Sequence, residues 1–300
     1  MSDDVRIGII GLGNMGTSHA KQMLNGDIPG AKLSAVCDLD SDNLKDYADN
    51  DDIAVFATPD EFYAKAEIDA VVIATPHYDH TPLSVTGFEK NLHVLVEKPL
   101  AVHVNDAKKS IAAYENRSDK SKLFAEMFNQ RCNPLYQKLK ALVDNGELGE
   151  IRRVNWIITD WFRTEAYYAS GGWRATWEGE GGGVLVNQCP HQLDLVQWLF
   201  GMPNKIRAYA RCGQFHNIEV EDNVTAYMEY PNGATGVFIA TTGEAPGTNR
   251  LEVAGERGKV VIEHNKMHFT RNEVGMAEHS KTTEQGFSKP AVLEIDIPIQ

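Results

Sequence analysis

The chain has 300 residues, 42% of them hydrophobic, which is enough for two ordinary hydrophobic cores. Its 29 basic and 42 acidic side chains give a net charge of −13, so a phosphate backbone would be repelled and a nucleic-acid partner is not expected. No stretch reaches the roughly 18 apolar residues of a membrane span, and no basic leader precedes the first strand, so we expect a cytoplasmic protein that does not bind membranes. The four cysteines are widely spaced and form no CxxC pair, which favours buried thiols over disulfides or a metal site.

The first elements carry a dinucleotide-binding signature. A strand is predicted over Val5–Ile10, followed by the sequence GLGNMG and a helix over 17–24. In this order the glycines let the backbone turn tightly and approach a pyrophosphate, while the amino end of the helix faces the anion. The candidate cofactor-binding residues of this turn are Gly11, Gly13, Asn14, Met15 and Gly16.

A second strand, over 32–37, ends at Asp38, and this carboxylate lies 22 residues past Gly16. A carboxylate at this place accepts hydrogen bonds from the adenosine ribose hydroxyls of NAD and repels the 2′-phosphate of NADP. We therefore expect NAD rather than NADP. The alternative is that the acidic stretch 38–40 only caps the next helix.

Strands and helices go on alternating to about residue 128, which predicts a parallel, doubly wound α/β sheet. Thr75, Pro76 and His77 follow one of its strands and are expected to line the nicotinamide side of the cofactor crevice. His80 either caps the following helix or touches ligand. The further strands are predicted over 53–56, 70–75, 93–96 and 122–127, and the further helices over 59–65, 81–90 and 105–114.

The strand over 93–96 ends at Glu97, Lys98 and Pro99. Its apolar run has no polar alternation, which is typical of a central strand that is buried on both faces. Pro99 restricts the preceding residue to extended geometry, so Lys98 should be held in a fixed direction at the sheet edge where ligands bind. The alternative is that Glu97 and Lys98 merely solvate a strand end.

After about residue 128 the pattern changes to one helix and then mostly strands joined by tight turns, which predicts an α+β domain with a large, mostly antiparallel open sheet. The helix is predicted over 133–145, and the turns over 231–233 and 255–258. The strands are predicted over 152–159, 205–212, 223–230, 234–242, 250–254, 259–263, 266–270 and 292–300.

The segment 181–201 begins with three glycines and carries Asn187, His191 and Asp194. On one continuous helix these three polar side chains share a face. Pro190 removes a backbone hydrogen bond, so the alternative is two short helices, the second of which Pro190 opens. His191 is either a structural histidine or part of a binding site, and in the second case the three glycines would allow a ligand to approach it closely.

Aromatic side chains crowd the segment 156–177. Their rings suit a pocket that stacks on the apolar face of a sugar, while tyrosine hydroxyls and arginine side chains meet its hydroxyl groups. For Trp156, which lies on a predicted strand, core packing is the better expectation. The residues expected to contact substrate are Arg163, Tyr167, Tyr168 and Trp173, with Arg174 as an alternative to Arg163.

Taken together, the GLGNMG turn, Asp38, the Glu-Lys-Pro motif at 97–99, and the triple glycine with His191 and Asp194 resemble the Gfo/Idh/MocA family. This is the family of glucose–fructose oxidoreductase and inositol dehydrogenase. The resemblance covers nearly the whole chain. It implies a Rossmann domain, here residues 1–128, and a second domain, here 129–300, that binds substrate and whose exposed sheet face often mediates homodimers or homotetramers.

The resemblance also implies a nicotinamide-dependent dehydrogenase or reductase of sugars and polyols, in which Lys98 and His191 occupy the catalytic positions. Two departures stand out. Many members have an aspartate four residues before the histidine, where this chain has Asn187, and members are usually longer and end in a helical segment. We therefore expect either a truncated chain or a divergent short form.

The expected activity is hydride transfer between NAD and a hydroxyl of a sugar, glycoside or cyclitol. Oxidation of an alcohol requires a base within hydrogen-bond reach of the hydroxyl, and Lys98 and His191 are the candidates. Asn187 and Asp194 are expected to bind substrate, and no metal is expected. The alternatives are an NAD-dependent glycosidase that oxidises its sugar transiently and a non-catalytic dinucleotide or sugar sensor.

Overall fold

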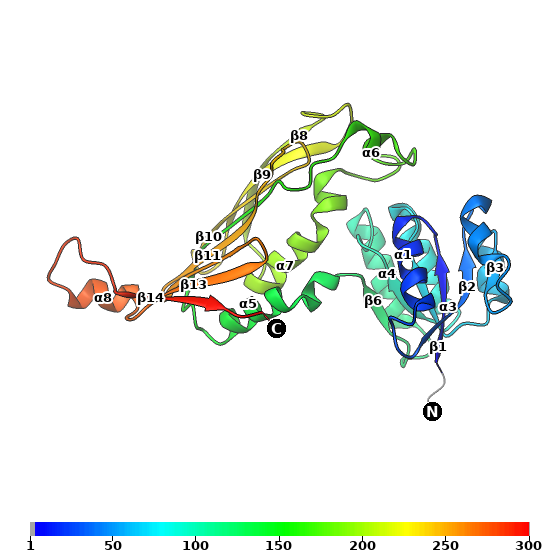
Figure 1. Ribbon diagram of the computed structural model, residues 1–300, viewed down its shortest axis with the longest axis horizontal. Coiled ribbons are helices and arrows are strands. Elements are labelled where there is room, and N and C mark those ends of the chain that lie inside the picture. Colours follow the sequence, from blue (N-terminus) through cyan, green and yellow to red (C-terminus); the bar gives the residue numbers. More distant parts are fainter. Residues whose placement is uncertain (1–3, 300) are drawn as a thin grey trace. The chain divides into compact units, whose positions relative to one another are not determined.

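A computed structural model describes residues 4–299 of the chain. The chain forms two compact units (Figure 1). The first contains the residues up to Met127 together with Glu178–Gly181, and the second contains Phe128–Trp177 and the residues from Gly182 onward. Among the described residues, every helix is too short or too polar to cross a membrane.

The first unit is built on a six-stranded parallel sheet in the order β3-β2-β1-β4-β5-β6, as the alternating pattern predicted. Its strands are β1 (Val5–Ile10), β2 (Ala31–Cys37), β3 (Ala54–Phe56), β4 (Ala70–Ile73), β5 (His93–Val96) and β6 (Phe124–Glu126). Its helices are α1 (Asn14–Leu24), α2 (Pro59–Lys65), α3 (His80–Glu89) and α4 (Val104–Asn116), with short 3-10 helices at Ser41–Tyr47 and His77–Asp79.

Both faces of this sheet are buried, because neighbouring residues of one strand point into different cores. Ile9 packs with α1 and the 3-10 helix Ser41–Tyr47 on one face. Ile10 packs with α2 and α3 on the other. Continuous apolar strands are therefore explained by helices on both sides, which leaves the carboxyl ends of the strands as the edge available for ligands.

The second unit is built on an eight-stranded sheet in the order β14-β13-β12-β11-β7-β10-β9-β8. All of its pairs are antiparallel except β7 with β10. Its strands are β7 (Ile151–Ile158), β8 (Lys205–Cys212), β9 (Glu221–Glu229), β10 (Thr235–Thr241), β11 (Asn249–Gly255), β12 (Gly258–Glu263), β13 (Lys266–Asn272) and β14 (Val292–Ile297).

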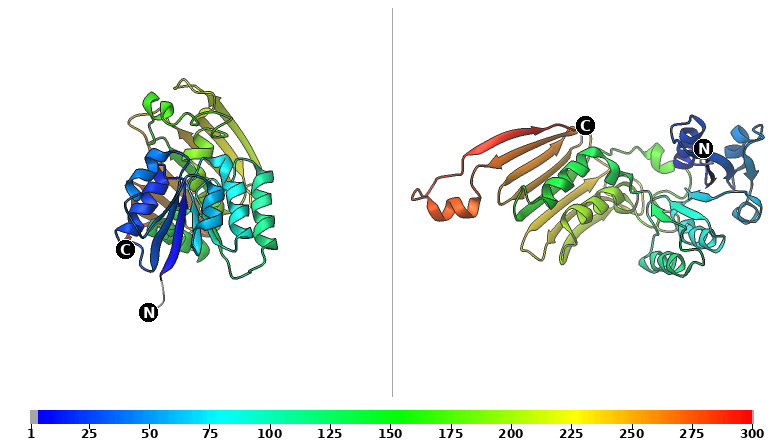
Figure 2. Two further views of the ribbon diagram at one scale, coloured as in Figure 1. Left: turned by 90° about the vertical axis from the view of Figure 1, so that its right-hand side faces the viewer. Right: turned by 90° about the horizontal axis from the view of Figure 1, so that it is seen from below.

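Helices α5 (Pro134–Asp144) and α7 (Pro190–Phe200) lie against one face of this sheet, as Figure 2 shows in its right-hand view. The core lies between them and the strands, where Trp156, Leu195 and Phe238 are almost fully buried. The other face carries no helix among the described residues, and Tyr209 and Tyr227 on it are 69% and 43% exposed. The alternation of buried and partly exposed residues along β10–β13 follows directly from this one-sided cover.

Three features of the structure decide between stated alternatives or differ from the expectations. Residues 184–200 do not form one helix: a π-helical turn (Val184–Gln188) is followed by α7, which Pro190 opens at its first position, so the two-helix alternative is confirmed. The strand predicted over 292–300 ends at Ile297, and residue 300 lies outside the described residues. Helix α8 (Met276–Thr282) was not predicted, because it buries no residue and so has no apolar period.

Candidate functional site

The three glycines of the turn between β1 and α1 face different surroundings. A side chain at Gly11, whose φ is +90°, would lie 2.7 Å from the carbonyl of Ala74, and one at Gly16 would lie 1.8 Å from the carbonyl oxygen of Gly11. A side chain at Gly13 would instead enter open space, more than 4 Å from the described atoms outside its sequence neighbours. Gly11 and Gly16 therefore let the chain fold back on itself, while Gly13 leaves room for a ligand.

Helix α1 begins at Asn14, and its first turn is uncharged. A cavity of about 610 Å³ opens beside Leu12, Gly13 and Thr17 and includes Lys21 in its lining. The unpaired N–H groups of a helix amino end and a nearby ammonium group both favour an anion. The turn thus fits the pyrophosphate of a dinucleotide, with Asn14 and Met15 at the amino end of the helix.

Asp38 is tied to this turn. Its carboxylate accepts hydrogen bonds from the backbone N–H of Leu12 at 2.6 Å and from that of Asp40 at 2.8 Å. The following 3-10 helix is capped by Asp40, whose side chain accepts from the N–H of Asp42. Asp38 therefore does not cap that helix, and its carboxylate stands at the edge of the glycine turn.

The turn after β4 is held by histidines. His77 is buried and its Nδ1 donates to the carbonyl of Glu180 at 2.8 Å. The residue that caps α3 is Asp79 and not His80, so the expectation that His80 caps the following helix is wrong. The ring of His80 is 1% exposed and bonds the carbonyl oxygens of Pro99 (2.7 Å) and Thr75 (2.9 Å). Thr75 and Pro76 thus belong to a rigid turn at the edge of the sheet.

The motif after β5 is anchored too. The carboxylate of Glu97 is 6% exposed and bonds His19 Nε2 of α1 at 2.7 Å and the N–H of Lys98 at 3.2 Å. Burial opposes its ionisation, but the hydrogen bond and charge of His19, together with Lys98, outweigh burial and lower the pKa of Glu97. Glu97 is therefore not a solvated strand end; it is a buried charge that fixes the backbone on which Lys98 sits.

In the second unit, the polar residues of 187–194 have distinct partners. Asp194 forms a bidentate ion pair with Arg131, at 2.8 and 2.5 Å. The ring of His191 lies edge-on to that of Phe128, with centroids 6.1 Å apart. Asn187 Nδ2 lies 3.4 Å from the hydroxyl oxygen of Tyr167. Asp194 thus fixes α7 and with it His191, while Asn187 is joined to the aromatic segment.

Tyr167, on the short helix α6 (Glu165–Ala169), is the centre of a cationic cluster. Its hydroxyl oxygen accepts hydrogen bonds from Arg174 and Gln188, both at 3.1 Å. The guanidinium carbons of Arg163 and Arg174 lie 5.0 and 4.8 Å from the centre of its ring. Arg174 also lies 4.7 Å from the ring of Trp173. Three of the four substrate residues predicted in the aromatic segment, Arg163, Tyr167 and Trp173, are therefore brought together around two positive charges.

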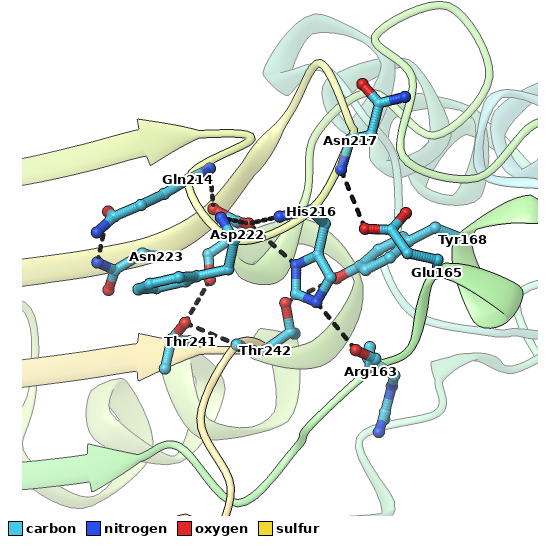
Figure 3. Close-up of polar contacts among 12 residues, drawn as sticks. Arg163, Glu165, Tyr168, Gln214, His216, Asn217, Asp222, Asn223, Thr241 and Thr242 are labelled. Carbon is cyan, nitrogen blue, oxygen red and sulfur yellow. Dashed lines mark hydrogen bonds and ion pairs between the residues drawn. The ribbon is translucent and has the colours of Figure 1, made fainter.

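Tyr168 faces a buried network that the sequence did not reveal (Figure 3). Its ring lies 4.8 Å from that of His216, and its hydroxyl is 2.7 Å from that of Thr242. His216 joins the carboxylate of Asp222 at 3.0 Å to the carbonyl of Arg163 at 2.9 Å. Asp222 also accepts the backbone N–H groups of residues 214–216. Through these contacts, His216 of the loop between β8 and β9 connects that loop to Arg163 and Tyr168 of the aromatic segment.

The strand order of the first unit, the open space at Gly13 and the uncharged start of α1 define a dinucleotide-binding protein of the Rossmann class. Within residues 4–299 no cluster of His, Cys, Asp and Glu is arranged to hold a metal. The family model described as "Oxidoreductase family, NAD-binding Rossmann fold" matches residues 5–147, and the "GFO/IDH/MocA C-terminal domain" matches residues 136–261. The chain belongs to the Gfo/Idh/MocA family of NAD-binding oxidoreductases, as its motifs predicted.

Relatives and solved structures agree with this assignment. The scyllo-inositol 2-dehydrogenase (NAD(+)) of Bacillus subtilis is 28% identical over 87% of this chain and 75% of its own length. A WlbA dehydrogenase from Chromobacterium violaceum, solved with NADH and UDP-GlcNAcA, has a TM-score of 0.84 and is 29% identical over 94% of this chain and 82% of that one. Myo-inositol 2-dehydrogenase from Lactobacillus plantarum has a TM-score of 0.75 and 27% identity over 87% and 76%.

Proposed function

We propose that this enzyme transfers a hydride between NAD and a hydroxyl-bearing carbon of a sugar, glycoside or cyclitol. The observation that carries the proposal is the arrangement of the first unit, in which a dinucleotide-binding turn and the anchored Lys98 lie at the carboxyl ends of one parallel sheet. The names of similar dehydrogenases, which act on inositols, support the substrate class.

Bound NAD supplies the hydride acceptor. The residues of this chain that would hold it are those at the glycine turn and at the strand ends. The N–H groups of Gly13, Asn14 and Met15 would face the pyrophosphate, and the carboxylate of Asp38 would accept from the ribose hydroxyls. Gly11 and Gly16 shape the turn, and the backbone of Thr75, Pro76, His77 and Glu97 would form the wall on the nicotinamide side.

Lys98 and His191 are proposed to handle the proton of the reacting hydroxyl. Hydride leaves a carbinol carbon only as the oxygen gives up its proton, so a basic group must receive that proton or an ammonium group must stabilise the developing alkoxide. Lys98 can do either. His191 is oriented by α7, which the Asp194–Arg131 pair fixes. We assign Asp194 to this orienting role and propose that it acts on substrate through His191.

The cluster around Tyr167 is proposed to hold the substrate. Guanidinium and amide N–H groups donate to hydroxyl oxygens, and the rings of Tyr167, Tyr168 and Trp173 offer apolar faces. Arg163 and Asn187 contribute the donors. Asn187→Ala should mainly raise KM. Asn187→Asp should shift the pH profile of kcat/KM if residue 187 neighbours the catalytic proton, and superimposable profiles would leave it a binding role only.

The central test is Lys98→Met, which keeps the apolar stem and removes the amine. Single-turnover reduction of NAD with inositols and free sugars should slow by about 10²–10⁴-fold, the range of general acid–base catalysis. Lys108→Met is the control, because Lys108 is exposed on α4 of the same unit. Unchanged hydride transfer in Lys98→Met would reject the assignment. Net formation of NADH would support a dehydrogenase. Release of free aglycone without net consumption of NAD would indicate the glycosidase, and binding of NAD without any turnover would indicate the sensor.

We also propose a homodimer or homotetramer formed through the open face of the second sheet, where Tyr209 and Tyr227 are exposed. Tyr209→Glu with Tyr227→Glu should reduce the mass measured by light scattering to that of the monomer. An unchanged mass would place the interface elsewhere. A cytoplasmic location is proposed with it, because the described cysteines form no disulfide.

A further inference from the structure

We propose that His19 and His80 are positioning residues for Lys98, and that each fixes one of its two chain neighbours. This inference rests on the proposed role of Lys98. Glu97, which precedes Lys98, is bonded to His19 of α1, and Pro99, which follows it, is bonded to His80 at the start of α3. The two histidines come from different helices and meet the chain on either side of a single residue.

His80 joins two turns at the same edge of the sheet. Its Nδ1 lies 2.7 Å from the carbonyl oxygen of Pro99 and its Nε2 lies 2.9 Å from that of Thr75. Thr75 follows β4 and Pro99 follows β5, and these strands are paired. The ring therefore acts as a spacer of fixed length between two strand ends, and its burial leaves it little freedom to tilt.

Imidazole suits this position because its two ring nitrogens can donate in divergent directions. A carbonyl oxygen only accepts, so the neutral ring donates to one of the two carbonyls at a time, and only the protonated ring donates to both at once. Burial, the largest influence, lowers the pKa of His80, while the two carbonyls, Glu97 and Asp79 act in the opposite direction. A glutamine or asparagine amide has both donors on one nitrogen and cannot span the same two oxygens.

His19 acts on the other side. It bonds one carboxylate oxygen of Glu97 at 2.7 Å, while the other oxygen accepts the N–H of Lys98 at 3.2 Å. The His19 and Glu97 side chains are 12% and 7% exposed, so water weakens their interaction little. Because His19 lies on α1, the helix that begins at the glycine turn also fixes the backbone of Lys98.

Positioning of this kind affects the rate more than affinity. A displacement of about 1 Å in a reacting group can cost about 10²-fold in rate. Loss of either histidine should therefore lower kcat and single-turnover hydride transfer by up to about 10²-fold. The affinity for NAD should fall less, because the histidines bond the proposed wall on the nicotinamide side and not the glycine turn.

The test uses chemical rescue of the full chain. His80→Gly leaves a buried space the size of the missing ring, so added imidazole, which can bond both carbonyls, should restore a large part of the lost rate. 1-Methylimidazole has no N–H when neutral and only one when protonated, so it should not restore the rate. For His19, Gln should retain more activity than Leu, because only Gln can donate to Glu97. If His80→Gly does not fold, His80→Gln and His80→Leu replace it, with the same expected order.

Arg117→Met is the matched control. Arg117 also donates to backbone carbonyls, those of residues 114, 120 and 122, but far along the chain from Lys98. The substitution Arg117→Met should lower the stability of the protein and leave kcat unchanged. Full kcat in the His80 and His19 variants, beside an inactive Lys98→Met, would overturn this inference and leave the proposed function intact. Full activity of Lys98→Met would overturn both, and equal rescue by the two imidazoles would reduce His80 to a space filler.

Discussion

The chain has two glycine-rich stretches, and their glycines do different things. In the turn at 11–16, a side chain at Gly13 would enter open space beside the start of α1. In the triple glycine, a side chain at Gly183 would lie 2.0 Å from the backbone oxygen of Glu221, and one at Gly182 would lie 2.6 Å from Val186. The first stretch leaves room for a ligand, whereas the second lets one piece of the chain pass close to another.

The expectation that the triple glycine admits a ligand is therefore wrong for Gly182 and Gly183. Here Glu221 packs against the glycine backbone, and its carboxylate accepts the N–H groups of Gly183 and Leu185 at 2.9 and 3.0 Å. Those N–H groups begin the π-helical turn, so Glu221 caps it. A run of glycines in a sequence shows that something approaches closely, but it does not show whether that is ligand or protein.

Gly183→Ala should have the largest effect. The new methyl group meets backbone that cannot move aside, so we expect a loss of about 4 kcal/mol or more in the free energy of unfolding, or failure to fold. Urea denaturation followed by tryptophan fluorescence measures it. Gly286→Ala, where a side chain would meet open space, is the control. A fully stable Gly183→Ala would contradict the close packing of the second glycine stretch.

Gly13→Ala should separate ligand space from chain packing within the first stretch. The fold should be unchanged, while the affinity for NAD falls by about 1–3 kcal/mol because the methyl group takes space meant for the pyrophosphate. Gly16→Ala, beside it, should instead lose stability. Calorimetric titration with NAD and thermal unfolding of both variants check this. The same loss of stability in both would show that Gly13 serves packing too.

Asp38→Ser should shift cofactor choice. The carboxylate bonds the glycine turn through the N–H of Leu12, and its removal relieves repulsion of a 2′-phosphate. The ratio of NADP to NAD affinity should rise at least about tenfold, or 1.4 kcal/mol. Asp40→Ser is the matched control, since serine can still cap the 3-10 helix. A constant ratio would remove Asp38 from the cofactor site.

The smallest effect is expected at the edge of the second sheet, where β14 is joined to β13 by surface charges. His268 bonds Asp296 at 2.9 Å and Glu294 at 2.5 Å, and these contacts raise the pKa of His268. Thr270 and His268 lower the pKa of Glu294.

The contribution of the Glu294 carboxylate to stability is present above the ordinary pKa of Glu, about 4.3, and is lost as the pH falls through the lowered pKa of Glu294. The contribution of protonated His268 to stability is complete below the ordinary pKa of His, about 6.5, and is lost as the pH rises through the raised pKa of His268. Hydrogen exchange of β14, corrected for intrinsic rates, should therefore be slowest between about pH 4.3 and 6.5. His268→Gln should flatten the profile, and a flat wild-type profile would contradict the linkage.

The parts that the sequence could predict depend on local patterns. Alternating apolar strands and helices predicted the Rossmann unit, and a strand that ends at a lysine predicted where Lys98 lies. The contacts that fix these residues could not be predicted, because each joins segments that are distant in the sequence. They are those of His80 with Pro99, His216 with Arg163, and Arg131 with Asp194. A histidine or aspartate in the sequence gives no sign of which carbonyl or guanidinium it will meet.

The parallel pair of β7 and β10 has a consequence for how the second unit is made. β7 is the first strand of its sheet to leave the ribosome, yet it lies in the middle, between β10 and β11. Its Trp156 stays without these neighbours until residues near Phe238 and Leu251 have been synthesised. Pairings this distant in sequence form slowly, so the nascent second unit should need protection from aggregation until β11 emerges, while the first unit can already fold.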